Sequence, residues 1–309
     1  MTRILKAKPI VDDMVDHYRM EIIPDLETRL NGKVTLAVVM VGNNPASKKY
    51  VENKRKLCER VGINMQLHHF ETATPAQIHT TITELNSYDD VHGIILQLPL
   101  PQELQPFEKA LIDAIAPEKD VDGLTSTSAA EMYTTNGNPR FIPCTPKGIL
   151  DLLVLNDIPV VDQNIVIVGR GKLIGKPLAE LLKSWNANVT TLHSKTSMEK
   201  MRDAFSRADI VITCCGKPRM FDNITWNFLT QDNEKQITVI DCSTTEYELE
   251  DGTKIMSGDC YTEELLEQCV NINAITTVFG CVGPMTVLSL ISNTIHAASE
   301  GIEWNTETD

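Results

Sequence analysis

The sequence lacks any apolar run that approaches the ~18 residues needed for a membrane-spanning helix. Residues 1–9 carry charges but have no apolar segment after them, so a secretory signal is not expected. Positive charge is also scarce, because 28 Lys and Arg face 42 Asp and Glu, which gives a net charge of −14. That balance argues against a general nucleic-acid or membrane-surface binder. We therefore expect a protein that binds neither nucleic acid nor membrane.

The sequence also lacks any cysteine pair with metal-site spacing. None of its eight cysteines forms a C-x-x-C pair, and their spacing fits neither a zinc site nor a small disulfide scaffold. Several lie in apolar surroundings, where a reduced cysteine behaves as a small hydrophobe. We therefore predict no metal site, and the simplest interpretation is a reducing, cytoplasmic compartment. The 309 residues, 42% of them apolar, are enough for two domains with ordinary cores.

What is present is an alternation of strand and helix patterns. In the first half, helical spacing covers residues 9–31, 45–61, 75–86 and 103–116, and apolar strand runs cover 36–41, 65–69 and 91–98. A loop rich in Thr, Ser, Asn and Pro over 124–146 is the best domain boundary. After it we predict helices at 146–156, 175–185, 197–208 and 285–299, and strands at 165–168, 188–192, 210–214 and 237–241. The alternation predicts an α/β fold with open, mostly parallel sheets.

Four polar residues in the first half suggest a pocket. Tyr50 and Lys54 are four apart and share a helix face. Gln97 closes an apolar strand and Asp122 lies in a turn, and such groups line pockets at strand ends. Together they indicate a lysine site for a polar, ring-shaped substrate. Three plainer interpretations stay open: a surface lysine, a glutamine that satisfies backbone groups, and an aspartate that only forms its turn.

A glycine-rich turn in the second half indicates a dinucleotide site. Gly169, Gly171 and Gly175 follow an apolar strand and precede a helix, whose N-terminus favours a pyrophosphate. Glycines in an ordinary turn are the alternative. The next strand ends in hydroxylic and basic residues around Ser194, where an NAD enzyme usually has an acid, and Arg170 lies in the glycine turn. This arrangement suits a 2′-phosphate, so the predicted cofactor is NADP and not NAD.

Six strings in register resemble one family. The strings, in chain order, are Ser47-x-x-Tyr50-Val-x-x-Lys54-x-Lys56, Gln97-Leu-Pro-Leu-Pro101, Asp120-Val-Asp122-Gly123, Pro143-Cys-Thr145-Pro-x-Gly148, Gly169-Arg170 and Gly283-Pro284-Met285-Thr286. In them the chain resembles the methylenetetrahydrofolate dehydrogenase/cyclohydrolase family over essentially its whole length. The resemblance implies two α/β domains around a cleft, with a folate-binding catalytic domain over 1–145 plus the C-terminal helix 284–309. A Rossmann-like NADP-binding domain would cover 146–283. A homodimer is implied as well.

The resemblance also implies roles for individual residues. Lys54 would be the catalytic lysine, with Tyr50 as its helix neighbour and Gln97 as its hydrogen-bond partner. Tetrahydrofolate derivatives would be bound by Tyr50, Gln97, Leu98, Asp122 and Pro284. The NADP-binding set would be Thr145, Gly169, Arg170, Gly171, Gly175, His193, Ser194 and Cys242.

The implied activity is bifunctional. NADP-dependent oxidation of 5,10-methylenetetrahydrofolate gives the 5,10-methenyl cation, a step that chiefly needs alignment. Hydrolysis of that cation to 10-formyltetrahydrofolate needs proton transfer, which a lysine performs only if its pKa falls toward neutrality. The alternatives are a single-function cyclohydrolase with a weakened dehydrogenase, an unrelated NADP dehydrogenase, and a non-catalytic folate- or nucleotide-binding homologue. The intact folate-side residues argue against the last.

The departures from the family's usual residues gather on the cofactor side. Gly171 stands where a serine is usual, Ser243 where a glycine is usual, and Thr277, Phe279 and Cys281 replace two prolines and a glycine. Loss of the serine hydroxyl and of two prolines that fix φ would weaken NADP binding. We therefore expect lower NADP affinity than is usual in the family, with folate binding preserved.

Overall fold

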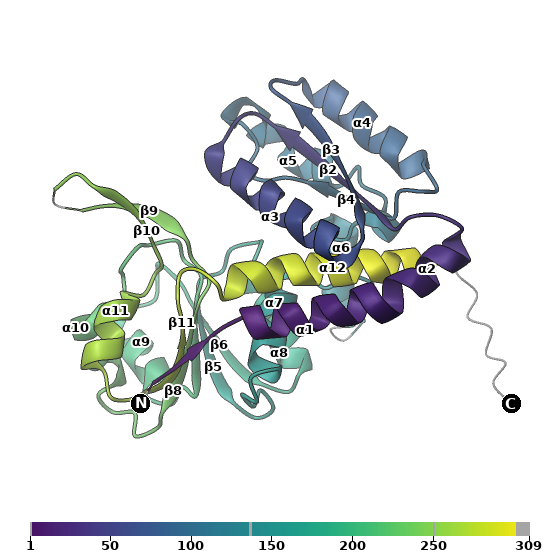
Figure 1. Cartoon of the computed structure of the whole chain (residues 1–309). Helices are drawn as coiled ribbons and strands as arrows, with labels where there is room; N and C mark the ends of the chain where they lie inside the picture. Colours follow the sequence, from purple (N-terminus) through teal and green to yellow (C-terminus); the bar gives the residue numbers. More distant parts are fainter. Residues whose placement is uncertain (1, 136–137, 250, 301–309) are drawn as a thin grey trace, which may run out of the picture. The chain divides into compact units, whose positions relative to one another are not determined.

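The computed structural model describes residues 2–135, 138–249 and 251–300 (Figure 1). It divides the chain into two compact units, each with its own parallel sheet. One unit holds residues 11–144 and 287–300, and the other holds residues 2–10 and 145–286. We call them the small-sheet unit and the large-sheet unit. No helix in the described ranges has the length and apolar character required to cross a membrane.

The small-sheet unit is built on three parallel strands in the order β3-β2-β4. The strands are β2 (Thr35–Val41), β3 (Asn64–Phe70) and β4 (Gly93–Leu96). All seven residues of β2 are buried, because a central parallel strand is covered on both faces. The chain leaves β2 toward β3 through α3 (Pro45–Val61) and crosses back to β4 through α4 (Pro75–Ser87). Right-handed crossovers in opposite directions place α3 and α4 on opposite faces (Figure 1).

The remaining helices of this unit differ in part from the expected ones. Residues 9–31 form α1 (Lys8–His17), a π-helical segment (Tyr18–Ile22) and α2 (Ile23–Leu30). The helix predicted over 103–116 is a 3-10 helix (Gln102–Phe107) followed by α5 (Glu108–Ile112), with Pro106 inside the first. A short 3-10 turn (Pro117–Lys119) comes next. The prediction of an irregular loop over 124–146 is wrong for α6 (Ser126–Thr134), which the Thr125 hydroxyl caps.

The large-sheet unit contains six parallel strands in the order β1-β11-β8-β7-β5-β6. These are β1 (Arg3–Leu5), β5 (Asn164–Val168), β6 (Asn188–Leu192), β7 (Ile210–Thr213), β8 (Ile237–Asp241) and β11 (Ile272–Thr276). The helices are α7 (Cys144–Val154), α8 (Gly175–Ser184), α9 (Met198–Phe205), α10 (Asn223–Thr230), α11 (Thr262–Gln268) and α12 (Val282–Glu300), the last continuing into the other unit. A hairpin of β9 (Thr245–Glu248) and β10 (Lys254–Ser257) extends from this unit (Figure 1).

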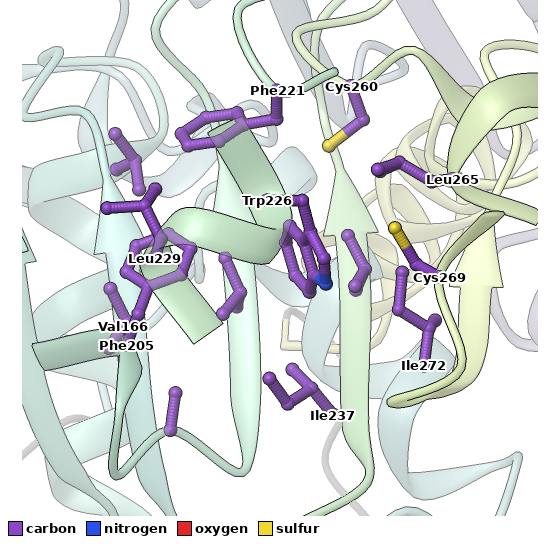
Figure 2. Close-up of a cluster of buried hydrophobic side chains, with 14 of the residues drawn as sticks. Val166, Phe205, Phe221, Trp226, Leu229, Ile237, Cys260, Leu265, Cys269 and Ile272 are labelled. Carbon is purple, nitrogen blue, oxygen red and sulfur yellow. The ribbon is translucent and has the colours of Figure 1, made fainter. Parts of the chain in front are cut away.

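The helices α9, α10 and α11 cover one face of the large sheet through a continuous apolar core (Figure 2). Trp226 of α10 is fully buried at its centre, and its indole Nε1 donates a hydrogen bond to Asn271 Oδ1 at 3.0 Å. Phe205 lies edge-on to Trp226 and stacks with Phe221 at a centroid distance of 5.9 Å. Aromatic packing of this kind, with the indole N–H satisfied, stabilises the sheet that carries the residues predicted to bind the cofactor.

The α/β fold with mostly parallel sheets is confirmed. The sequence pattern did not predict β1, β9, β10, β11, α10 or α11. The first residues of the chain were expected in the first domain. Residues 2–10 lie in the large-sheet unit instead, because β1 pairs in parallel with β11.

Candidate functional site

Lys54 and Gln97 meet at the carboxyl edge of the small sheet. Strand order reverses at β2, since the chain runs to β3 on one side and β4 pairs on the other, and ligands of open α/β sheets bind at such a reversal. Asn44 caps α3 after β2, because its side chain accepts hydrogen bonds from two backbone N–H groups of the first turn. Gln97 directly follows β4. The two connections therefore bring a helix face and a strand end to the same edge.

The Lys54–Gln97 contact is a well-defined hydrogen bond. Lys54 Nζ donates to Gln97 Oε1 at 2.9 Å. Gln97 is 8% exposed, its backbone N–H donates to Val39 O at 2.8 Å, and its Nε2 donates to Leu98 O at 2.6 Å. With Nε2 committed to a carbonyl, Oε1 is left as the acceptor that faces the lysine. Gln97 thus holds the half-buried lysine at a fixed place without adding a charge.

The environment of Lys54 favours a neutral amine. Burial lowers the pKa of Lys54 from its ordinary value, and the negative charge of Asp122 opposes that shift. Two buried thiols lie in the same surroundings, and burial raises the pKa of Cys58 to about 12 and that of Cys144 well above its ordinary value. Both cysteines are therefore neutral thiols near pH 7. Sequence reasoning treated them only as small apolar residues, although Cys144 lies inside one of the quoted strings.

The turn that carries Asp122 is fixed by its neighbours. Asp120 is 1% exposed and accepts hydrogen bonds from the backbone N–H of Thr125 at 2.8 Å and the hydroxyl of Ser128 at 2.6 Å. Gly123 has φ +68°, and a Cβ there would come within 2.9 Å of the Pro143 nitrogen. The half-buried Asp122 side chain is consequently presented by a rigid turn. Asp120 therefore has a structural role, although it was predicted only as a member of one of the quoted strings.

Two further residues of α3 have hydroxyl groups that could bind a ligand. Tyr50 is 45% exposed, one helical turn before Lys54, and within the described residues its hydroxyl has no hydrogen-bond partner. Ser47 is 3% exposed, and its Oγ is buried without a partner. A buried hydroxyl without a partner is uncommon and suits a site where a polar ligand completes the hydrogen bonds. Leu98 is half-buried directly beside Gln97.

In the large-sheet unit the strand order reverses between β5 and β7, and the glycine turn (Gly169–Gly175) lies there. Gly169 has φ +135°, and a Cβ on it would come within 2.6 Å of Cys214 O and Sγ. A Cβ on Gly175 would come within 2.4 Å of Gly169 O, so both positions require glycine. Gly171 differs, because nothing lies within 4 Å of its Cβ position. The turn leads into the N-terminus of α8, which favours an anion when a phosphate is bound.

The remaining cofactor-side residues lie on neighbouring strand ends. Ser194 is exposed just after β6, which pairs with β5, and Arg170 is exposed in the glycine turn. His193 is half-buried, and its Nδ1 accepts a hydrogen bond from the backbone N–H of Lys195 at 3.2 Å, which shapes this turn. Cys242 follows β8, and burial raises the pKa of its thiol well above the ordinary value. The donors and glycines present fit a dinucleotide phosphate group.

Two predicted site residues lie at the starts of helices in the large-sheet unit. Thr145 is in the first turn of α7, and its Oγ1 accepts a hydrogen bond from Thr286 Oγ1 at 3.2 Å. Pro284 is half-buried in the first turn of α12. A Cβ on Gly148 would come within 2.8 Å of Met285 C, so the two helix starts pack closely. Pro284 thus belongs to a different unit from Lys54, Gln97 and Asp122.

Comparison with known proteins assigns the chain to a family. Residues 5–122 match the tetrahydrofolate dehydrogenase/cyclohydrolase catalytic domain, and residues 143–302 match the tetrahydrofolate dehydrogenase/cyclohydrolase NAD(P)-binding domain. The chain therefore belongs to the tetrahydrofolate dehydrogenase/cyclohydrolase family.

Individual relatives agree with this assignment. The chain is 39% identical over 264 residues to the bifunctional protein FolD of Bacillus cereus, covering 85% of each chain, and 35% identical over 300 residues to that of Macrococcus caseolyticus, covering 96% of this chain and 97% of the relative. The crystal structure of a FolD dehydrogenase/cyclohydrolase from Campylobacter jejuni superposes with a TM-score of 0.85 at 30% identity, covering 98% of this chain and 100% of that one. A Trypanosoma brucei FolD, complexed with NADP cofactor and inhibitor, superposes with a TM-score of 0.84 at 26% identity, covering 97% of this chain and 98% of that one.

Proposed function

We propose that this family member oxidises 5,10-methylenetetrahydrofolate with NADP and hydrolyses the resulting 5,10-methenyl cation to 10-formyltetrahydrofolate. The observation that carries the proposal is the half-buried Lys54, whose pKa is lowered by burial and whose amine is held by the neutral amide of Gln97 at 2.9 Å. Family membership over both halves of the chain supports the same two reactions. We assign folate binding to the small-sheet unit and NADP binding to the large-sheet unit.

The hydrolysis follows from the Lys54 site. Water adds to the methenyl carbon and loses one proton, which gives a neutral carbinolamine. N5 then gains a proton as its bond to that carbon breaks, and the hydroxyl releases its remaining proton to solvent as the formyl group forms. A neutral Lys54 amine accepts the first proton, and the ammonium so formed donates the proton that N5 gains. The substrate cation lowers the pKa of the lysine further, while Gln97 keeps Nζ in place. Asp122 holds the pterin ring, and Tyr50 and Leu98 complete the substrate contacts of the small-sheet unit in this proposal. Pro284, in the large-sheet unit, stays a predicted substrate contact.

The oxidation depends on placement more than on acid or base groups. When bound, NADP would supply the acceptor for the hydride that leaves the methylene carbon. Gly169, Gly171 and Gly175 allow the backbone to approach the diphosphate at the start of α8, while Arg170 and Ser194 contact the 2′-phosphate. Further contacts along the cofactor come from Thr145, His193 and Cys242. We further propose that the protein is cytoplasmic and that it forms a homodimer. Light scattering of the purified protein tests the homodimer directly.

A pair of assays on purified protein tests the proposal. One follows NADPH absorbance with methylenetetrahydrofolate, and the other follows loss of methenyltetrahydrofolate absorbance. Wild type should show both activities, and Lys54→Ala should lose the hydrolysis after correction for the spontaneous rate. Lys56→Ala is the matched control, because this lysine is on the same helix but is exposed and lies 3.5 Å from Glu52. Hydrolysis at the wild-type rate in Lys54→Ala would refute the assignment of the proton-transfer group.

A further inference from the structure

Asp259 is a fully buried carboxylate that the proposed reactions do not use. It is 0% exposed and follows β10, near the carboxyl edge of the large sheet. Among the described residues no lysine or arginine pairs with it in a salt bridge. Its oxygens accept hydrogen bonds instead from the backbone N–H of Cys215 at 2.8 Å, the backbone N–H of Lys217 at 2.6 Å and the hydroxyl of Ser243 at 2.7 Å. Charge-assisted bonds of this kind offset the cost of burying the carboxylate.

The Cys215 thiol also donates to Asp259 at 3.2 Å, and Ser243 extends this set of contacts. Its Oγ donates to Asp259 and accepts a hydrogen bond from the backbone N–H of Gly216 at 3.2 Å. Its own backbone N–H donates to the buried Asp241 at 2.9 Å. Three consecutive N–H groups, at residues 215, 216 and 217, are therefore all bound by the Asp259–Ser243 pair.

These three residues belong to the β7 loop, by which we mean Cys214–Lys217. The loop starts where β7 ends, and Cys214 packs so closely on Gly169 that a Cβ on the glycine would come within 2.6 Å of Cys214 O. The glycine turn and the β7 loop thus flank the point where the strand order reverses, which is where dinucleotides bind in open α/β sheets. Gly216, with φ +66°, lets the loop turn back at this place.

We propose that Ser243 and Asp259 are positioning residues that hold the β7 loop in the conformation that receives NADP. The inference rests on the proposed placement of NADP at the β5–β7 reversal. Without the Ser243 hydroxyl, the Gly216 N–H has no protein acceptor and Asp259 loses a donor, so the loop samples other conformations. Binding NADP then has to order the loop, which lowers affinity. Ser243 stands where the family usually has glycine, so restoring the glycine should weaken NADP binding.

The test measures NADP binding by calorimetry on the full-length protein with Ser243→Ala and Ser243→Gly. We expect the NADP Kd to rise about fivefold or more, the effect of one hydrogen bond of about 1 kcal/mol. The KM for NADP should rise similarly, while kcat at saturating NADP and the methenyl hydrolysis rate stay within about twofold of wild type. Thr244→Ala is the matched control, because this neighbouring side chain is exposed and removing its hydroxyl leaves the Asp259 contacts intact.

A variant in the glycine turn, which leaves Ser243 and Asp259 unchanged, tests the placement of NADP separately from the role of these two residues. Gly169→Ala forces a Cβ against Cys214 and should abolish NADP binding if the dinucleotide lies at the β5–β7 reversal. Unchanged NADP affinity in Gly169→Ala overturns the placement itself. Loss of affinity in Gly169→Ala together with a wild-type Kd in both Ser243 variants overturns only the positioning role. A loss of hydrolysis alongside NADP binding in the Ser243 variants also overturns it, since that result indicates general destabilisation.

Discussion

A carboxylate in place of the Gln97 amide should disable the hydrolysis by keeping Lys54 protonated. In Gln97→Glu a negative charge would lie about where Oε1 now accepts the Lys54 hydrogen bond at 2.9 Å. Two unit charges at that separation attract by about 6 kcal/mol at an effective dielectric constant of about 20. Gln97 is 8% exposed, so desolvating the new carboxylate offsets much of this attraction. If only about a quarter remains, the pKa of Lys54 rises by about one unit, because one unit corresponds to about 1.4 kcal/mol.

The sign of the effect on the pH profile follows directly. The neutral amine is the base, so hydrolysis rises with pH through the Lys54 pKa, which burial lowers in the wild type. Raising that pKa moves the rising limb to higher pH, so Gln97→Glu should lose up to about tenfold of kcat near pH 7.5 and recover it in more alkaline buffer. Gln102→Glu, which adds the same charge at an exposed position, should leave the limb in place. If the rising limb of the pH profile of hydrolysis keeps its position or moves to lower pH in Gln97→Glu, this account of the Lys54 pKa is refuted.

Three further substitutions test the charge beside Lys54 and the proposed contacts with NADP. Asp122→Asn removes the charge that raises the pKa of Lys54, so the limb for hydrolysis should move to lower pH, and a shift to higher pH contradicts the electrostatic account. Arg170→Ala should weaken NADP binding by about 1–3 kcal/mol in calorimetry and change NAD binding little, whereas equal losses would remove Arg170 from the 2′-phosphate. Gly171→Ser should tighten NADP binding and leave the affinity for a folate analogue unchanged, since nothing lies within 4 Å of the Cβ position. An unchanged NADP Kd in Gly171→Ser would mean that the missing hydroxyl does not limit affinity.

Much of the fold was predictable because the signals were local. The α3 helix was predicted at its observed bounds, Pro45–Val61, from helical spacing between a proline and Gly62. Strands β6 and β8 likewise match the predicted ranges. β1 was missed because Arg3–Leu5 is a three-residue strand, and only pairing with a strand some 270 positions later defines it. Short edge strands carry too little pattern to be predicted without their partner.

The proximity of Lys54 and Gln97 was predictable from the sequence for a physical reason. Lys54 and Gln97 lie 43 positions apart, but each follows a strand of the same small parallel sheet, and carboxyl ends of parallel strands share an edge. The position of the Cys144 thiol beside Lys54 and Asp122 was not predictable, because burial of a thiol next to two ionisable groups is a tertiary property. The Asp259 contacts were equally hidden, since they join the ends of three separate segments.

The structure changes how the cofactor-side departures should be weighed. Ser243 and Cys281 each stand where the family usually has a glycine. Considered alone, each replacement suggests a loss of backbone freedom. In the fold the Ser243 hydroxyl binds Asp259, and the Cys281 thiol donates to Leu5 O at 2.7 Å, so both side chains make contacts that glycine cannot make. Gly171 has no such compensation, because its Cβ position faces open space. The expectation of weak NADP binding therefore no longer rests on Ser243 or Cys281, and it keeps Gly171 and the two lost prolines at Thr277 and Phe279.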